Sequence, residues 1–145
     1  MSKFPSCFPK NFESEILPPE AKHEDKNVYR VIKNGEINRD SFISTFEEIK
    51  RGLRNEPKKG INLKDPGTYS TYCFENREDV QYVLDICMKN KKKDKPRAFI
   101  AKGVTEKHCG PSQATRERKM DKKDSHVDWW IYEDSSPDLY FKEDK

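Results

Sequence analysis

The sequence contains few of the residues that usually build a protein core. Apolar residues make up 32% of its 145 positions and charged residues make up 38%, which is a lean apolar supply for a globular protein. This length is typical of one domain. The core must therefore be small and must depend on the eight phenylalanines, six tyrosines and two tryptophans, because each aromatic side chain buries roughly 150–250 Å².

Long apolar segments are also missing. No run approaches the roughly 18 apolar residues of a membrane span, and the first residues are not followed by the apolar stretch of a secretory signal. The sequence therefore predicts a cytoplasmic protein without a membrane partner. Its four cysteines form no CxxC pair, so we expect reduced thiols, with Cys73 and Cys87 in the core.

Neither sign of charge dominates. The 29 basic and 26 acidic residues leave a net charge of +3, which favours solubility and does not require a nucleic-acid partner. Two stretches rich in lysine and arginine, 89–95 and 116–123, offer phosphate contacts for single-stranded nucleic acid. The simpler interpretation of both stretches is solvated surface.

Four strands and two principal helices are predicted from the local pattern. Segments rich in β-branched and aromatic residues predict strands at 28–32, 68–74, 97–103 and 126–133. Helical spacing of apolar residues predicts one helix from Asp40 or Ser41 to Gly52 and another from Asn76 to the lysines at 89–93. The predicted buried stripe of the second helix is Val80, Val83, Leu84, Ile86 and Cys87. This order predicts an α+β fold with a small, mainly antiparallel sheet.

The remaining segments are predicted to be irregular. Residues 104–125 indicate a long polar loop with one helical turn near 113–118, and Ser136-Pro137 predicts a short closing helix. Residues 1–27 carry two Phe-Pro pairs and a Pro-Pro pair, and proline keeps the preceding residue extended. We therefore expect an extended N-terminal arm at 1–27, followed by a single domain at 28–145.

Two roles are open for this arm. Its apolar side chains either pack onto the domain or dock onto a protein partner, together with the strand that holds Trp129 and Trp130. The apolar side chains concerned are Phe4, Phe8, Phe12, Ile16 and Leu17.

The segment 126–133 holds both tryptophans and one of the three histidines. An extended strand would place one set of side chains on one face, namely His126, Asp128, Trp130 and Tyr132. It would place the other set on the opposite face, namely Val127, Trp129, Ile131 and Glu133. A carboxylate can orient an imidazole, so His126 and Asp128 are a candidate acid–base pair. The nearby His108 and Cys109 lack the spacing of zinc ligands, and we expect no metal.

Arg30 interrupts an apolar strand, and a guanidinium suits phosphate or carboxylate. The string Val28-Tyr29-Arg30, then a helix, then Tyr69-Ser70-Thr71 leading into a second helix, resembles the Arg and Ser-Thr elements of ADP-ribosyltransferase-like proteins. The resemblance covers these short strings between residues 28 and 133. The chain departs from the family pattern at Ile131, where the family commonly has an acidic or amide residue.

The resemblance implies an NAD-binding domain with a defined set of roles. Arg30 would hold the phosphates or ribose, Ser70 and Thr71 would shape the nicotinamide pocket, and Glu133 would steady the cationic ribose in the transition state. On the strand that ends at this glutamate, Trp130 and Tyr132 are further candidates for contact with the cofactor.

A purely structural interpretation, without a functional site, also accounts for these residues. Arg30 would then pair with a carboxylate at the edge of the core, Ser70 and Thr71 would be ordinary strand residues, and Glu133 would cap the surface. Two other functions remain open from the sequence: a non-enzymatic protein-interaction module, such as a toxin, phage or defence-system factor, and single-stranded nucleic-acid binding.

Overall fold

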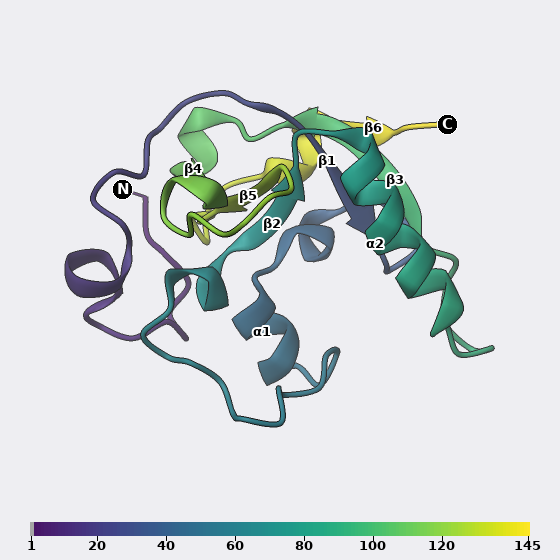
Figure 1. Cartoon of the computed structure of the whole chain (residues 1–145), viewed down its shortest axis with the longest axis horizontal. Coiled ribbons are helices and arrows are strands. Elements are labelled where there is room, and N and C mark those ends of the chain that lie inside the picture. Colours follow the sequence, from purple (N-terminus) through teal and green to yellow (C-terminus); the bar gives the residue numbers. More distant parts are fainter. Residues whose placement is uncertain (1) are drawn as a thin grey trace.

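One antiparallel sheet organises the chain (Figure 1). The computed structural model describes residues 2–145. Every strand pairing in that range is antiparallel, and the spatial order is β4-β5-β2-β1-β3-β6. The predicted α+β fold is confirmed. The strands are β1 (Asn27–Ile32), β2 (Thr71–Phe74), β3 (Phe99–Val104), β4 (Ser112–Ala114), β5 (His126–Trp129) and β6 (Phe141–Glu143).

Two α-helices and several single helical turns complete the structure (Figure 1). The α-helices are α1 (Thr45–Lys50) and α2 (Arg77–Lys89), and α2 packs on β1, β2 and β3. Within residues 2–145, no helix is long and apolar enough to cross a membrane. The single turns are Phe12–Ile16, Arg39–Phe42, Pro66–Tyr69, Lys107–Cys109, Thr115–Glu117 and Pro137–Tyr140.

The predicted helix from Asp40 or Ser41 to Gly52 is wrong as a continuous element. The turn Arg39–Phe42 ends in extended backbone, and Ser44 then starts α1. The Ser44 hydroxyl accepts from the Glu47 N–H at 3.1 Å, and the Glu47 carboxylate accepts from the Ser44 N–H at 3.0 Å. This capping box begins a new helix, although the spacing of apolar residues continues across the break.

Two strands inside predicted irregular segments were missed. β4 lies within the predicted loop 104–125. The predicted short closing helix is the single turn Pro137–Tyr140, and β6 begins directly after it at Phe141. Each strand has only three residues, too few to show an alternating pattern. The predicted strand 68–74 is also shorter than expected, because Asp65 caps the turn Pro66–Tyr69.

The predicted strand 126–133 ends at Trp129. Trp130 and Tyr132 still donate backbone hydrogen bonds to the carbonyls of Pro111 and Cys109, but Pro111 has no N–H to return a bond. Gly110 adopts a φ of +147°, and a Cβ at this position would lie 1.9 Å from the Trp130 carbonyl oxygen. Regular strand pairing therefore ends at Trp129, because the next residue, Trp130, lies against Gly110.

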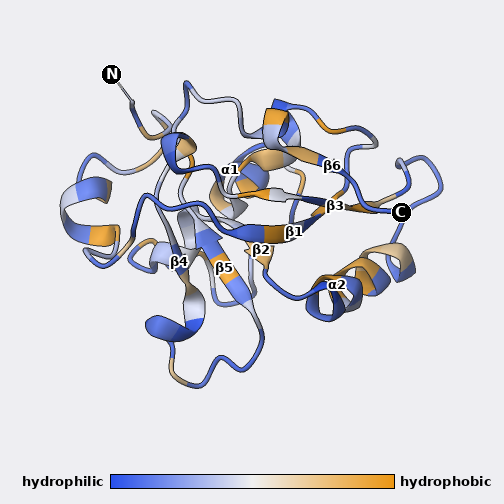
Figure 2. Cartoon of the chain, turned by 90° about the horizontal axis from the view of Figure 1, so that it is seen from above, coloured by the Kyte–Doolittle hydropathy of each residue, from blue (hydrophilic) through white to orange (hydrophobic). Residues whose placement is uncertain are grey.

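Three apolar clusters divide the small supply of apolar residues. One contains Trp129 and Phe42 on one face of the sheet, and a second contains Val31 and Phe74 beneath α2. Figure 2 shows hydrophobic and hydrophilic segments alternating along α2. The predicted burial of Ile86 on α2 is wrong, because this residue is 43% exposed. The other members of the stripe pack on the sheet as predicted: Val80, Val83, Leu84 and Cys87.

The third cluster joins the N-terminal arm to the domain. Phe8 and Phe12 are buried against Phe46, Tyr69 and Trp130, and the other predicted arm residues pack around them. The arm contains a helical turn at Phe12–Ile16, and Lys22 exchanges two backbone hydrogen bonds with Ser112 of β4. The predicted packing of the arm is confirmed, and the arm forms part of the core.

Arg30 fills a gap between β1 and β2, which pair only at Tyr29 and Phe74. Its side chain is buried, with the residue 3% exposed. The guanidinium donates from Nε to the Ser41 carbonyl at 2.9 Å and from Nη1 to the Tyr72 carbonyl at 2.7 Å. These bonds tie two strands to the turn Arg39–Phe42.

A buried carboxylate balances this charge. Burial raises the pKa of Glu48, but the charges of Lys33 and Arg30 outweigh it and hold the pKa below its ordinary value. Lys33 Nζ lies 2.8 Å from the Glu48 carboxylate. The predicted pairing of Arg30 with a carboxylate is wrong for the described residues 2–145, because the ion-pair partners of Glu48 are Lys33 and Arg54. Arg30 donates to backbone carbonyls and affects Glu48 only through its charge.

We expect replacement of Arg30 by methionine to destabilise the fold by about 2–4 kcal/mol, because the Tyr72 and Ser41 carbonyls would lose their donor inside the core. Lys142→Met on the edge strand β6 is the matched control, since the lysine is exposed, and it should cost under about 1 kcal/mol. Urea unfolding of both variants measures the difference. Equal stability of the two variants would contradict the structural role of Arg30.

Candidate functional site

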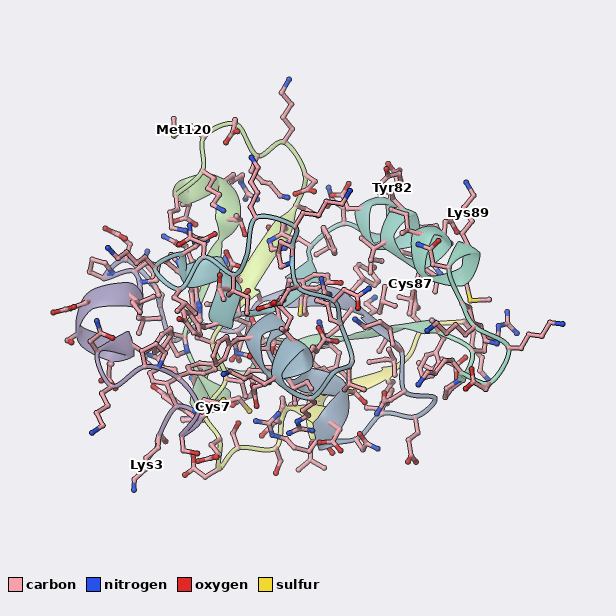
Figure 3. The ribbon with its side chains drawn as sticks, turned by 90° about the horizontal axis from the view of Figure 1, so that it is seen from below. Lys3, Cys7, Tyr82, Cys87, Lys89 and Met120 are labelled. Atoms are coloured by element: carbon pink, nitrogen blue, oxygen red, sulfur yellow. The ribbon has the colours of Figure 1, made fainter. Side chains whose placement is uncertain are left out.

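Two adjoining hollows lie over β2 and β5. The first has a volume of about 530 Å³ and the second about 290 Å³. They share Thr45, Tyr72, Lys122 and His126, so they meet above the Tyr72 and His126 rings. We call the two hollows together the Tyr72–His126 groove. In Figure 3, β5 runs between α2, which carries Tyr82, and the loop that carries Met120.

The two hollows differ in chemistry. Tyr72, Phe74, Tyr82 and Val83 give the first hollow an aromatic and apolar wall, and Tyr82 is 69% exposed. The second hollow carries three cations and two carboxylates, and each cation is paired with a carboxylate. Arg118 lies 2.8 Å from Asp128, Lys119 lies 3.2 Å from Asp65, and Lys122 lies 3.7 Å from Asp124. Its charged lining residues are Arg118, Lys119, Lys122, Asp65 and Asp128.

Asp128 is the centre of the hydrogen-bond network beneath the groove, and it is only 1% exposed. Its Oδ1 accepts from the Ser70 hydroxyl at 2.6 Å. Its Oδ2 accepts from the Thr115 hydroxyl at 2.9 Å and from Arg118 Nη2 at 2.8 Å. A buried carboxylate needs several donors to remain charged, and these three come from two segments, one before β2 and one after β4.

The charge of Asp128 is fixed by this environment. Burial raises the pKa of its carboxyl group, but the charge of protonated His126 and the hydrogen bonds from Ser70 and Arg118 outweigh burial. The pKa therefore lies below its ordinary value. Asp128 is a carboxylate at neutral pH and acts only as an acceptor.

Because the Asp128 carboxylate can only accept hydrogen bonds, the position of the proton on His126 can be assigned. Thr115 Oγ1 lies 2.6 Å from His126 Nδ1 and also 2.9 Å from the Asp128 carboxylate. A hydroxyl has one proton to donate. Donation to the charged oxygen is favoured, since otherwise two lone pairs would face each other in a buried site. Thr115 therefore accepts from Nδ1–H, and Nε2 of the neutral imidazole carries the lone pair.

The surroundings of the ring keep the imidazole neutral and hold its orientation. Burial lowers the pKa of His126, and this effect outweighs the opposing effect of the Asp128 charge. The ring stacks on Tyr72 at a centroid distance of 5.5 Å and 12° between planes, and the Phe74 ring meets it edge-on at 5.3 Å. No hydrogen-bond partner of Nε2 is found among residues 2–145. The arrangement can therefore accept a proton from a ligand in the groove.

The sheet order explains how these groups meet. β5 lies between β4 and β2. Ser70 precedes β2, Thr115 follows β4, and His126 and Asp128 lie two residues apart on β5, facing the same way. Arg118 reaches the site from the turn after β4, donating also to Gln113 at 2.8 Å and lying over the Trp130 ring.

Three predicted site residues come together, namely Ser70, His126 and Asp128. Thr115 and Arg118 were missed, because nothing in the sequence indicated that β4 would pair with β5. A short polar strand gives no alternating signal, so no local pattern could have identified them.

Two other predicted residues lie in the core, outside the groove lining. The donors of Arg30 point to backbone carbonyls, as described above. Thr71 is buried, and its hydroxyl donates to the Phe42 carbonyl at 3.0 Å.

Trp130, Tyr132 and Glu133 lie toward the N-terminal arm. Trp130 is buried, and its Nε1 donates to the Pro66 carbonyl. The Tyr132 hydroxyl lies 2.7 Å from His23 Nε2, and the Glu133 N–H donates to the Lys3 carbonyl. Figure 3 shows Lys3 at the opposite edge of the molecule from Tyr82 and Met120.

The cysteines show no activated thiol near the groove. Burial raises the pKa of Cys73 to about 12 and that of Cys109 to about 11, whereas a nucleophilic cysteine needs a lowered pKa. His108 is exposed and pairs with Glu106 at 2.7 Å. Within residues 2–145, no three histidine, cysteine or acidic side chains are grouped to hold a metal ion.

Comparison of this chain with protein-family models, with curated proteins and with solved structures found no significant match.

We expect stability to fall on mild acidification because of His126. Its pKa is lowered in the folded state, whereas in the unfolded chain it is about 6.5. The stabilisation that comes from the neutral His126 imidazole is complete above about pH 6.5 and declines as the pH falls through this value. It levels off below the pKa of the folded state. Urea unfolding at pH 7.5 and 5.5 measures the loss. His126→Gln should reduce it, and the control His108→Gln should not; an unchanged loss in His126→Gln would contradict a buried neutral imidazole.

Proposed function

We propose that this domain binds a nucleotide, with NAD as the first candidate, in the Tyr72–His126 groove. The observation that supports the proposal is that a hollow with an aromatic wall meets, above one imidazole, a second hollow lined by three cations in ion pairs. A nucleotide has the same division, with a flat aromatic base on one side and phosphates on the other.

The dimensions and the chemistry support this assignment. Small-molecule sites usually occupy about 300–1,000 Å³, and the first hollow has about 530 Å³. A base would stack on the exposed Tyr82, because every base has an aromatic face; the Tyr72 ring is already stacked with His126. The phosphates would lie beside Lys119 and Lys122 in the second hollow, where they would compete with Asp65 and Asp124 for the ammonium groups.

The resemblance to ADP-ribosyltransferase-like proteins motivates NAD as the candidate. Ser70, from the Ser-Thr element, lies in the groove lining. Glu133 and Arg30 do not, so the proposal covers binding of the cofactor and leaves transfer of ADP-ribose to a separate assay of nicotinamide release. The free cysteines are consistent with the cytoplasm as the place of action.

Calorimetric titration of the full chain with NAD, ADP-ribose and AMP tests the proposal. We expect Tyr82→Ala and Lys122→Ala each to weaken binding by about ten-fold, the effect of losing roughly 1.4 kcal/mol of stacking or phosphate contact. The matched controls are Tyr140→Ala and Lys89→Ala, which are exposed outside the groove lining. They should bind as the unaltered chain does.

Binding that is equally weakened by the groove variants and by their controls would contradict the location. Absence of heat and of any change in melting temperature with all three ligands would contradict nucleotide binding itself. Nicotinamide release that is lost in Glu133→Gln would show that transfer chemistry occurs away from the groove.

A further inference from the structure

We propose that the groove cleaves single-stranded RNA, with Nε2 of His126 taking the proton from a ribose 2′-hydroxyl. The inference rests on the proposed nucleotide binding and adds a reaction and a substrate class to it. It depends on three features of the groove: a neutral imidazole with a defined free nitrogen, two hollows that meet at that imidazole, and a basic segment beside them.

The first feature is the orientation of the base. Asp128 is held by three donors, Thr115 donates to Asp128 and accepts from His126 Nδ1–H, and the ring is stacked on Tyr72. The imidazole therefore cannot present Nδ1 to a ligand. Only Nε2 is available, and a general base must present a lone pair within hydrogen-bond reach of the proton that it removes.

The second feature is the position of this base between two different hollows. His126 lines both. A base stacked on Tyr82 in the aromatic hollow would place its ribose near the junction and the following phosphate near Lys119. The 2′-hydroxyl and the adjacent phosphodiester, which are the reacting groups of RNA, would then both lie beside His126.

The third feature favours a strand over a mononucleotide. The segment from Arg116 to Lys123 continues from the second hollow with further cations, including the exposed Lys123. Phosphates beyond the first would contact this segment. The strand must be single, because a base can enter the aromatic hollow only after it has left a helical stack.

The reaction balances without a further reactant. His126 Nε2 accepts the proton of the 2′-hydroxyl while that oxygen forms a bond to the adjacent phosphorus. The bond from phosphorus to the 5′-oxygen of the next nucleotide breaks, and this oxygen takes a proton from the Lys122 ammonium. The products are a 2′,3′-cyclic phosphate and a free 5′-hydroxyl, and solvent returns the imidazole proton to the lysine.

In this scheme Thr115 is a positioning residue. Its hydroxyl links Asp128 to Nδ1–H and so fixes which nitrogen faces the substrate. Thr115→Val preserves the shape of the side chain but allows Nδ1 to lose its proton or the ring to turn. We expect a slower reaction in this variant and a pH profile displaced from that of the unaltered chain.

The test uses a short, unstructured RNA with a fluorescent 5′ end and the same sequence carrying 2′-O-methyl groups throughout. Fluorescence anisotropy with the methylated strand measures binding, because that strand has no 2′-hydroxyl to react. Electrophoresis and mass spectrometry of the unmodified strand measure cleavage and identify the ends. We expect binding of both strands and cleavage of the unmodified one alone.

The variants locate the base. We expect His126→Gln to reduce the cleavage rate by about 100-fold or more, the usual contribution of a general base, and to leave anisotropy binding within two-fold. The control Lys142→Ala, an exposed lysine on β6 outside both basic stretches, should change neither. The rate should be level at neutral pH and fall in acid as His126 protonates. The charged groups that face this ring are Asp128, Asp124, Asp79, Lys122, Arg118 and Arg54.

The possible negative results distinguish failure of RNA cleavage from failure of nucleotide binding. Binding of the methylated strand without cleavage of the unmodified one overturns the RNA-cleaving role and leaves nucleotide binding intact. Failure to bind RNA, NAD and AMP alike overturns both proposals. Cleavage that persists in His126→Gln, or products that carry a 3′-hydroxyl, also overturns this inference.

Discussion

Burial of the Asp128 carboxylate is the constraint on which the site depends. A charged oxygen pair that is 1% exposed must be surrounded by donors, or the cost of removing it from water would exceed what the small core supplies. Ser70, Thr115 and Arg118 provide those donors from segments that precede β2 and follow β4. Folding of this part of the sheet and assembly of the site are therefore the same event.

Polar groups also compensate for the small number of apolar residues in the rest of the chain. The sequence has few aliphatic residues, and aromatic side chains do much of the packing in three separate clusters. Polar groups join these clusters: Arg30 bridges the gap between β1 and β2, and the arm binds the edge of β4 through Lys22. The buried charged and hydroxyl groups thus mainly hold the fold together. Of the hydrogen-bond network around Asp128, His126 presents Nε2 to the groove.

The sequence predicted the features that have a local cause. Alternation in β5 correctly placed Val127 and Trp129 on one face and His126 and Asp128 on the other, and the apolar stripe of α2 was correct except at Ile86. The capping box at Ser44 was visible as a Ser-x-x-Glu pattern but was overlooked, since apolar spacing continued through it. Such features depend on neighbours within a few residues.

What could not be predicted depends on pairing between distant segments. Thr115 joins the site because β4 pairs with β5, and three polar residues give no sign of that pairing. The resemblance placed Arg30, Ser70, Thr71 and Glu133 in one pocket, whereas in the structure only Ser70 lines the groove. Side-chain direction decides this outcome: one residue along a strand separates the Ser70 hydroxyl at Asp128 from the Thr71 hydroxyl at Phe42.

Asp128, acting through the Thr115 hydroxyl, fixes the proton of His126 on Nδ1. Nitrogen-15 NMR of the histidine side chains at pH 7 measures where this proton lies, with the His126→Gln spectrum identifying the signals. We predict that Nδ1 carries the proton and that Nε2 is unprotonated. A proton on Nε2, or a doubly protonated ring at this pH, would contradict the account.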